Sequence, residues 1–479
     1  MSQVLPNLID ARPVESGDRE ADVNPSNISE IVCEYSVATT ADVDQAVAAA
    51  RQAFTAWSRS TPQERFDVLD RAGTEILARR EDLGRMLARE QGKPLADGIG
   101  EAARAGAIFK YFAGEALRLG GEKFDSVRPG IDVEITREPV GVVAAVTPWN
   151  FPLAIPAWKI APALACGNCL VLKPAELTPA SPWAIVDIVL RAGLPPGVLN
   201  LVMGPGALVG AALVRSPHVD AVSFTGSQAV GQSVAAAAVS TGARVQLEMG
   251  GKNPLVVIDD ADLATAVAVA VNGAFFQAGQ RCTASSRIIV TDGIYDRFLA
   301  AMVERTKRLV VDDALKAGTE IGPVVDQRQL DKDLSYIDIG RREGARLVCG
   351  GERLQRATDG YYLAPAIFTD TTPEMRINRE EIFGPVASII RVRDYEEALA
   401  VANDTPFGLS AGIVTTSLKH ARHFTRHAQS GLVMVNLPTA GLDYHVPFGG
   451  RKKSSYGPRE QGSYAREFYT IVKTAYIAS

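Results

Sequence analysis

The chain has 479 residues, of which 47% are hydrophobic, and its formal net charge is −5. A chain of this length and composition can bury a large core and is expected to divide into two or three domains. The acidic balance and the absence of a Lys/Arg tract exclude the usual charge pattern of a nucleic-acid-binding protein. We find no signal-like N-terminal segment and no apolar run of about 20 residues, so we expect a cytoplasmic protein without membrane association.

Five cysteines are scattered along the chain, at Cys33, Cys166, Cys169, Cys282 and Cys349. An odd, scattered set argues against a disulfide framework and for a reducing compartment. Cys166 and Cys169 form a C-x-x-C pair, but they precede an apolar strand and not a helix, which disfavours a redox or zinc role. The five histidines show no metal-ligand spacing, so we predict no metal site.

The region before residue 120 is predicted to be mainly helical. Apolar residues recur at helical spacing from Val43 to Trp57, and Thr40 is the predicted N-cap of this helix. Pro62 opens a second helical stretch, which continues with breaks to about Leu119.

From Val142 onward, short apolar runs alternate with helical segments. The first group of predicted strands is VVAAVT, CLVLK, VLNLVM, AVSF and PLVVI. A second group follows Cys282 and consists of RIIVT, RLVCG, ASIIRV and AGIVTT, with helices such as residues 295–309 between them. This alternation is typical of βαβ units with a parallel sheet, so the sequence predicts two α/β domains.

Two polar residues stand at predicted strand ends, where open α/β sheets bind their ligands. The turn TPWNFP presents Trp149, Asn150 and Phe151 after the strand that ends at Thr147. Asn150 could donate its side-chain amide to a developing oxyanion, or it could form an Asx-turn or a helix N-cap. Glu248, in QLEMGGKNP, could act as a general base or could be a solvated or salt-bridged acid.

Three further segments follow predicted strands and have the composition of a nucleotide site. GPGALVG contains Gly206, and FTGSQAVG contains Ser227 and Val230. Glycine lets the backbone approach a phosphate, and the following helix offers free N–H groups. LKPAE adds Lys173 and Glu176, an ammonium and a carboxylate that could bind ribose hydroxyls. Neither glycine pattern is G-x-G-x-x-G, so each alone could be a turn and a helix cap, but together the three segments favour a cofactor site.

The segment FFQAGQRCTASSR places Cys282 between a Gly-Gln-Arg turn and small hydroxyl residues, where it could be a buried thiol or a nucleophile. Seven motifs, namely TPWNFP, LKPAE, FTGS, LEMGGKNP, FFQAGQRCTASSR, EEIFGP and PFGGRKKSSYG, occur in the order and spacing of the aldehyde dehydrogenase superfamily. The chain therefore resembles this family over nearly its whole length.

The resemblance implies that Cys282 is the nucleophile, that Glu248 is the general base, and that Asn150 forms the oxyanion hole with the Cys282 backbone N–H. It implies NAD as the cofactor, with NADP as the alternative, because Glu176 would repel a 2′-phosphate while Lys173 would soften that repulsion. The predicted cofactor contacts are Trp149, Lys173, Glu176, Gly206, Ser227, Val230, Glu381 and Phe383.

The resemblance also implies an α/β fold with a Rossmann-like cofactor domain, an α/β catalytic domain and a small β oligomerisation arm. We predict the cofactor domain at residues 1–121 and 140–249, the catalytic domain at 250–450, and the arm at 122–139 and 463–479. Exposed apolar strand faces in the arm would need a partner, so we expect a homodimer or homotetramer.

For the substrate, PWNFPLAIPAWKIAPALACGN and HVPFGGRKKSSYGPREQG resemble most the 2,5-dioxovalerate (α-ketoglutaric semialdehyde) dehydrogenases, which implies a semialdehyde. Many succinate-semialdehyde enzymes carry an arginine where this chain has Trp158. The alternative cation is Arg281, which could bind the substrate carboxylate or form an outward salt bridge. Phe151, Trp158 and Phe276 could equally form a pocket for an aliphatic or aromatic aldehyde, and the small Thr283 leaves room beside the sulfur. Succinate and glutarate semialdehydes are further candidates.

Two other classes share these motifs. A catalytically silent relative would serve as a structural or binding protein, but the joint presence of Cys282, Glu248 and Asn150 argues against it. A CoA-acylating aldehyde dehydrogenase would pass the acyl group to CoA, whereas Glu248 favours transfer to water.

Overall fold

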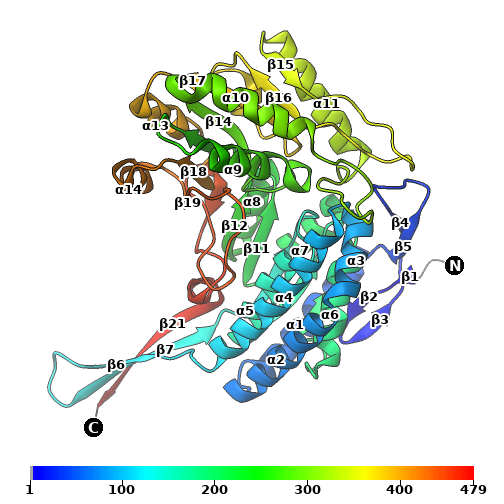
Figure 1. Ribbon diagram of the computed structural model, residues 1–479. Helices are drawn as coiled ribbons and strands as arrows, with labels where there is room; N and C mark the ends of the chain where they lie inside the picture. The colour runs from blue at the N-terminus through cyan, green and yellow to red at the C-terminus, as the bar shows by residue number, and fades with distance from the viewer. Residues whose placement is uncertain (1–3, 479) are drawn as a thin grey trace.

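In the computed structural model, which describes residues 4–478, the predicted helical region forms four helices (Figure 1). They are α1 (Thr40–Trp57), α2 (Pro62–Ala78), α3 (Arg80–Gln91) and α4 (Leu95–Ala116). The N-cap of α1 is Thr39 and not Thr40, because the Thr39 hydroxyl accepts the Asp42 N–H while the Asp42 carboxylate accepts the Thr39 N–H. This reciprocal pair requires an acidic residue three positions after the cap, which only Thr39 has.

The region before α1 forms short strands that the sequence pattern did not predict. They are β1 (Val4–Leu5), β2 (Asn7–Ile9), β3 (Arg12–Val14), β4 (Arg19–Val23) and β5 (Ile31–Ser36). Each strand spans only a few residues, several of them polar, so none shows the alternation of a longer strand. β2 and β3 extend the edge of the first large sheet, and β1, β5 and β4 form a separate small sheet.

The first large sheet has the strand order β20-β12-β11-β8-β9-β10-β2-β3. Its parallel centre consists of β8 (Val142–Val146), β9 (Cys169–Lys173), β10 (Leu199–Leu201), β11 (Ala221–Gly226) and β12 (Arg244–Met249), and β20 (Ser455–Tyr456) pairs antiparallel at the edge. The chain runs outward from β8 through β9 to β10 and then returns to β11 on the other side of β8. This reversal creates a crevice at the carboxyl ends of β8 and β11, where doubly wound sheets bind ligands.

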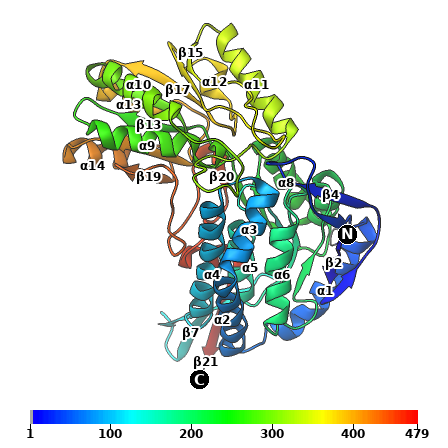
Figure 2. The ribbon, with the colours of Figure 1, turned by 45° about the vertical axis from the view of Figure 1, so that its right-hand side comes forward.

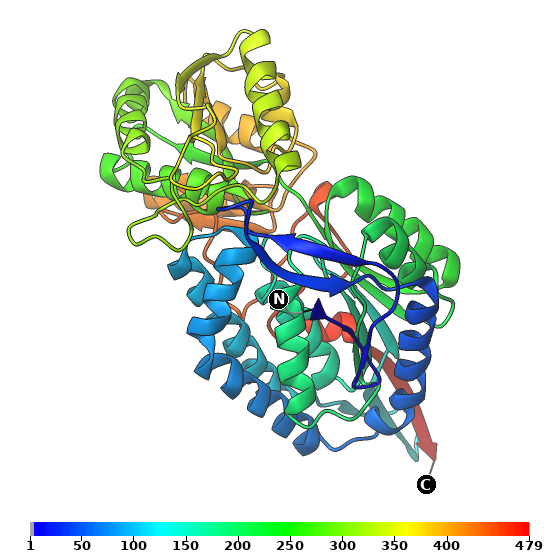
Figure 3. The same ribbon diagram turned by 90° about the vertical axis from the view of Figure 1, so that its right-hand side faces the viewer.

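Two helical layers cover this sheet, as the views in Figure 2 and Figure 3 show. One layer contains α2, α3, α4, α5 (Ala154–Ala165) and α6 (Ala180–Arg191). The other contains α1, α7 (Ala211–Arg215) and α8 (Gln228–Thr241), and a π-helical turn at Gly206–Gly210 precedes α7. The apolar residues between the layers form the largest core of the molecule.

The second large sheet has the order β15-β16-β17-β14-β13-β18-β19 and is parallel except for the β15–β16 pair. Its strands are β13 (Asn253–Val257), β14 (Ser285–Thr291), β15 (Arg346–Cys349), β16 (Ala366–Thr369), β17 (Val386–Val392), β18 (Ser410–Val414) and β19 (Leu432–Val435). Its helices are α9 (Leu263–Phe275), α10 (Asp292–Lys307), α11 (Gln327–Arg342), α12 (Arg376–Arg379), α13 (Tyr395–Asn403) and α14 (Leu418–His427). Both sheets therefore have the parallel character that the sequence predicted, but PLVVI, which the sequence pattern grouped with the first set of strands, forms β13 of the second sheet.

A third, three-stranded antiparallel sheet projects away from the rest of the molecule (Figure 1). It consists of β6 (Glu122–Asp125), β7 (Ile131–Pro139) and β21 (Thr470–Ala478), and the short helix α15 (Arg466–Tyr469) leads into β21. Its exposed large apolar side chains are Phe124, Ile471, Val472, Tyr476 and Ile477. No helix within residues 4–478 combines the length and the apolar character needed to cross a membrane.

Candidate active site

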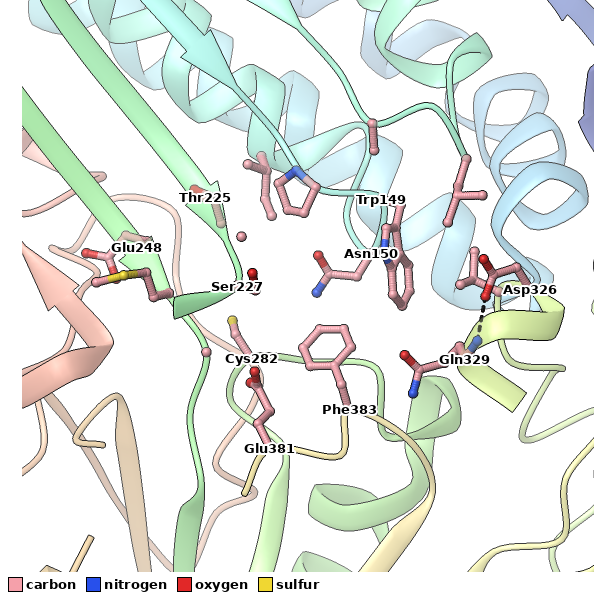
Figure 4. Close-up of a pocket in the computed structure, with 18 of the residues that line it drawn as sticks. Trp149, Asn150, Thr225, Ser227, Glu248, Cys282, Asp326, Gln329, Glu381 and Phe383 are labelled. Atoms are coloured by element: carbon pink, nitrogen blue, oxygen red, sulfur yellow. Dashed lines mark hydrogen bonds between the residues drawn. The ribbon is translucent and has the colours of Figure 1, made fainter. Parts of the chain in front are cut away.

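A cavity of about 500 Å³ lies between the two large sheets and is lined by residues from the segments around both (Figure 4). The TPWNFP turn after β8 supplies Trp149 and Asn150, and the FTGS turn after β11 supplies Ser227. The other side supplies Cys282, from the loop before β14, and Glu381. The fold thus brings together side chains from segments that are far apart in the sequence.

A buried ion pair holds the TPWNFP turn in place. The Lys93 ammonium lies 2.5 Å from a Glu101 carboxylate oxygen and donates a 2.8 Å hydrogen bond to the Asn150 carbonyl oxygen. The other Glu101 oxygen accepts the backbone N–H groups of Leu153 (2.9 Å) and Ala154 (3.1 Å) at the start of α5. Because these four contacts meet on one pair of side chains, Lys93 just before α4 and Glu101 within α4 fix the position of Asn150. The sequence interpretation missed both Lys93 and Glu101.

The Asn150 side chain is tied to the loop that carries the thiol. Its amide nitrogen donates a 3.1 Å hydrogen bond to the Gln280 carbonyl oxygen, two residues before Cys282. An amide nitrogen carries two N–H groups, so one of them is left for a ligand. Figure 4 shows the Asn150 amide and the Cys282 thiol facing the same part of the cavity.

The loop before Cys282 has an uncommon backbone. Gln277, Ala278 and Gly279 have φ angles of 55°, 53° and 65°, in the left-handed region that non-glycine residues rarely adopt. The Asn253 side-chain amide holds the other end of the loop by donating to the Cys282 carbonyl oxygen at 2.7 Å and to that of Ala284 at 3.0 Å. A strained backbone of this kind persists only where the surrounding structure holds it. Here the Asn253 hydrogen bonds hold the loop on the C-terminal side of the strained residues and so help to position Cys282.

The electrostatic surroundings keep the Cys282 thiol neutral at rest. Burial, with the negative charges of Glu248 and Glu381, raises the pKa of Cys282 to about 12. The backbone N–H groups of Cys282 and Thr283 act in the opposite direction, because they stabilise negative charge at this position and so lower the pKa of Cys282. Nucleophilic attack at neutral pH therefore requires that a base remove the thiol proton.

Glu248 stands at the end of β12 and is buried. One carboxylate oxygen accepts a 2.5 Å hydrogen bond from the Ser455 hydroxyl. Burial, followed by the negative charge of Glu460, raises the pKa of Glu248 well above its ordinary value. A Cβ atom at Gly449 would lie 2.7 Å from the other oxygen, so a glycine there leaves room for the carboxylate.

A buried Lys–Glu pair lies beside Glu248. The ammonium of Lys159 pairs with Glu460 and donates a 2.8 Å hydrogen bond to the Ser223 hydroxyl, and neither charged side chain is more than 2% exposed. The sequence interpretation missed this pair, because Lys159 and Glu460 are separated by 300 residues and only the folded chain joins them.

The side of the cavity away from α5 contains two aromatic rings and a carboxylate. The Trp149 and Phe383 rings meet edge to face, with centroids 5.4 Å apart. A Glu381 carboxylate oxygen accepts the Gly251 N–H at 2.8 Å. A Cβ atom at Gly250 would lie 2.0 Å from the other oxygen, which explains the glycine at this position.

The predicted nucleotide-binding residues Lys173, Glu176, Gly206, Ser227 and Val230 lie at or after the ends of β9, β10 and β11. The Lys173 ammonium pairs with the Glu176 carboxylate at 3.2 Å, and Glu176 is 45% exposed. The Ser227 hydroxyl caps α8 by accepting the Val230 N–H at 3.5 Å. Glu176 and Ser227 line the cavity, whereas Lys173, Gly206 and Val230 are not among its lining residues. An exposed carboxylate and a helix N-terminus are the groups that a ribose and a phosphate require.

The opposite side of the cavity is largely apolar and is formed by Ile155, Trp158, Leu409 and Phe448. The Trp158 and Phe448 rings are stacked, with centroids 5.5 Å apart and an angle of 29° between their planes. Trp158 therefore lines the cavity as predicted, and the other three residues were not foreseen.

Three other residues predicted for the substrate side lie outside the cavity lining. The Phe151 ring lies under the Lys93 ammonium, 4.2 Å from it. Phe276 packs against the core of the second sheet. Thr283 is buried, and its carbonyl oxygen accepts the Thr439 hydroxyl at 2.6 Å.

The placement of Arg281 differs from both predictions made for it. Its guanidinium donates to the carbonyl oxygens of Asn272 and Gly273, the latter at 3.0 Å, near the C-terminal end of α9. The residue is 8% exposed, does not line the cavity, and forms no ion pair within residues 4–478. The Arg281 side chain thus neither lines the cavity nor forms an outward salt bridge, because the carbonyl groups of the last turn of α9 accept its hydrogen bonds. Within the same residues, no group of His, Cys, Asp and Glu is arranged to hold a metal ion.

The fold and this site define an oxidoreductase that acts on aldehydes, and the chain belongs to the aldehyde dehydrogenase family, whose model matches residues 13–475. It is 46% identical to the alpha-ketoglutaric semialdehyde dehydrogenase of Bacillus subtilis (strain 168), over 97% of this chain and 95% of that protein. It is 45% identical to the alpha-ketoglutarate semialdehyde dehydrogenase of Haloferax volcanii, over 96% of each. The crystal structure of betaine aldehyde dehydrogenase from Staphylococcus aureus in complex with NAD+ matches with a TM-score of 0.96 and 36% identity, over 99% of this chain and 95% of that one.

Proposed function

We propose that this enzyme oxidises α-ketoglutaric semialdehyde (2,5-dioxovalerate) to 2-oxoglutarate with NAD+. The observation that carries the proposal is the thiol of Cys282, which faces one cavity together with the Asn150 amide. Identities of 46% and 45% to two α-ketoglutaric semialdehyde dehydrogenases over nearly the full length support the choice of substrate. In the overall reaction, aldehyde, NAD+ and water give carboxylate, NADH and two protons.

The groups around the cavity fit a nicotinamide dinucleotide, which supplies the hydride acceptor when it is bound. Glu176 would accept hydrogen bonds from the adenosine ribose, and the N-terminus of α8 would face a phosphate. Glu381 and the Trp149–Phe383 pair would lie nearer the nicotinamide ribose. Lys173, Gly206 and Val230 remain proposed contacts at the adenosine end.

The first chemical step takes place at Cys282. Sγ would add to the aldehyde carbonyl carbon as its proton passes, directly or through water, to the Glu248 carboxylate, which lines the same cavity and returns the proton to solvent before the second step; a tetrahedral thiohemiacetal forms. The free amide N–H of Asn150 and the Cys282 backbone N–H would stabilise its oxyanion. Departure of hydride from the same carbon leaves a thioester on Cys282.

The second chemical step needs a base close to the thioester. Glu248 would take a proton from water, and the resulting hydroxide would attack the acyl carbon and release Cys282 with the acid. Its raised pKa makes it a stronger base than an exposed carboxylate. Ser455 holds the carboxylate at 2.5 Å, so we infer that Glu248 rotates away from Ser455 toward the acyl group.

NAD+ is proposed to be preferred over NADP+. A carboxylate at Glu176 would repel a 2′-phosphate. Lys173 pairs with that carboxylate and offsets part of the repulsion, so we expect measurable NADP+ use at a lower kcat/KM.

The projecting sheet is proposed to join subunits into a homodimer or homotetramer. Its unpaired strand edges and exposed Ile471, Val472 and Ile477 are features that monomeric proteins avoid. On this view residues 122–139 and 463–479 form an oligomerisation arm. Light scattering at micromolar concentration tests the proposal, and a mass of one chain would refute it.

The substrate proposal is tested by kcat/KM for 2,5-dioxovalerate, succinate semialdehyde, glutarate semialdehyde, pentanal and benzaldehyde. We expect 2,5-dioxovalerate to be the best substrate, with free 2-oxoglutarate released in the absence of CoA. If pentanal or benzaldehyde is oxidised faster than every semialdehyde, the cavity serves apolar aldehydes and the proposal is wrong. If product forms only with added CoA, the acyl acceptor is not water.

A further inference from the structure

Three buried N–H groups on the substrate side of the cavity lack a hydrogen-bond acceptor within residues 4–478. They are Nε of Arg104, Nε1 of Trp158 and Nε2 of Gln461. Buried polar groups are almost always paired, and each unpaired one costs free energy. All three are donors, so the group that would satisfy them is one that only accepts hydrogen bonds.

The three side chains are neighbours. The Arg104 guanidinium donates a 3.4 Å hydrogen bond to the Gln461 side-chain oxygen, and its central carbon lies 6.0 Å from the centre of the Trp158 ring. Trp158 lines the cavity that contains Cys282, whereas Arg104 and Gln461 lie next to it outside the lining. The three donors therefore form one cluster directly behind the apolar side of the cavity, and Trp158 connects this cluster to the cavity.

Arg104 is a cation without a counterion. No carboxylate within residues 4–478 forms a salt bridge with it, although such pairs hold the buried Lys93 and Lys159. Burial lowers the pKa of Arg104, and the negative charges of Glu101 and Asp443 offset this only in part.

The fold holds these donors firmly. Arg104 follows Glu101 by one helical turn of α4, and Glu101 is anchored to the start of α5. Gln461 is fully buried and has a left-handed backbone, with φ at 60°, directly after the bridge that pairs Glu460 with Phe448. A strained residue whose side chain is buried beside a binding cavity is typical of a binding site.

Resting on the function proposed above, we propose that Arg104, together with Trp158 Nε1 and the Gln461 amide, binds the 2-oxo-carboxylate end of the substrate. A carboxylate and the adjacent ketone oxygen are acceptors only, which matches three unsatisfied donors. The guanidinium supplies the opposite charge, and an Arg–carboxylate contact is among the stronger hydrogen-bonded pairs. Arg104 thus takes the role that the sequence suggested for Arg281.

This contact is far from the reacting carbon, so it stabilises the bound substrate and the transition state alike. Loss of such a contact raises KM more than it lowers kcat. The quantity to measure is the preference ratio, defined as kcat/KM for glutarate semialdehyde divided by kcat/KM for pentanal, two aldehydes of equal carbon number that differ in the carboxylate.

The test compares the wild-type enzyme with Arg104→Gln, Arg104→Lys and the control Lys110→Gln. Lys110 lies on α4, as Arg104 does, and its outward-facing ammonium pairs with Asp70 of α2. We expect Arg104→Gln to lower the preference ratio about ten- to a hundredfold, mainly through KM. Arg104→Lys keeps the charge but loses the fork of donors, so its ratio should lie between those of Arg104→Gln and wild type. Lys110→Gln should keep the wild-type ratio.

Trp158→Phe tests the ketone contact separately. It keeps a ring against Phe448 but removes Nε1, so kcat/KM for 2,5-dioxovalerate should fall relative to that for glutarate semialdehyde, which lacks the 2-oxo group.

An unchanged preference ratio in Arg104→Gln would overturn the inference. An equal loss of activity on both aldehydes, together with a lowered melting temperature, would also overturn it, because this result would show that Arg104 has a structural role. Failure of the proposed function is distinguishable, because it appears in the wild-type enzyme as a preference for pentanal over every semialdehyde.

Discussion

Replacing Lys93 by Met should destabilise the protein and impair catalysis together. The Lys93 and Glu101 side chains are 0% and 3% exposed, with their charged atoms 2.5 Å apart. Lys93→Met would leave the buried Glu101 carboxylate without its counterion, which typically costs about 3–5 kcal/mol. Lys110→Met is the matched control, because its pair with Asp70 has the same separation but side chains 38% and 36% exposed. That half-exposed pair should contribute no more than about 1 kcal/mol.

These free energies translate into measurable shifts. At roughly 2–4 °C per kcal/mol for a domain of this size, Lys93→Met should lower the melting temperature by about 6–20 °C, and Lys110→Met by at most about 4 °C. Lys93 also holds the Asn150 carbonyl oxygen, so kcat should fall as well. Complete loss of one oxyanion donor costs about 10²–10³-fold in kcat, which is the upper bound for this effect. Circular dichroism melts and steady-state kinetics on pentanal measure both effects. Equal melting temperatures for Lys93→Met and Lys110→Met, with kcat unchanged, would refute the role given to the buried pair.

Three further substitutions probe the site. Glu248→Gln should show a burst of NADH followed by slow turnover. In the wild type, kcat limited by thioester hydrolysis should rise with pH, because the raised pKa of Glu248 delays its ionisation. A Glu248→Gln variant with the same pH profile would exclude Glu248 as the base. Glu176→Gln should raise the ratio of kcat/KM for NADP+ over NAD+ at least roughly tenfold, and a ratio that stays constant would show that the carboxylate does not discriminate. Gly250→Ala places a Cβ atom 2.0 Å from a Glu381 oxygen, so displacement of Glu381 should reduce kcat/KM for NAD+ by about 10²-fold, whereas wild-type kinetics would mean that Glu381 can move without consequence.

The parallel sheets were predictable from the sequence because their information is local. Runs such as CLVL at the start of Cys169–Lys173 are continuously apolar and are separated by helical segments, which identifies buried parallel strands. The motifs also place the site residues near strand termini. Trp149 and Asn150 follow β8, Glu248 lies at the end of β12, and Cys282 lies in the loop before β14.

Other features depend on contacts that no local pattern encodes. Arg281 is adjacent to Cys282 in the chain, yet its side chain turns to the end of α9, where the carbonyl oxygens of Asn272 and Gly273 accept its hydrogen bonds. Arg104 and Gln461 are separated by 357 positions, and their proximity arises from the packing of α4 against the segment after Phe448. A side chain's direction in a loop, and pairs of distant polar residues, become visible only in the folded chain.

The central claim is that the substrate becomes covalently attached to Cys282 and that Glu248 assists its release. Rapid quenching of Glu248→Gln after mixing with 2,5-dioxovalerate and NAD+, followed by peptide mass spectrometry, tests it most directly. We expect the peptide carrying Cys282 to gain the mass of the aldehyde less two hydrogen atoms, as a thioester requires, and we expect Cys282→Ala with Glu248→Gln to show no adduct. A burst of NADH without any acyl group on Cys282 would rule out covalent catalysis by this residue.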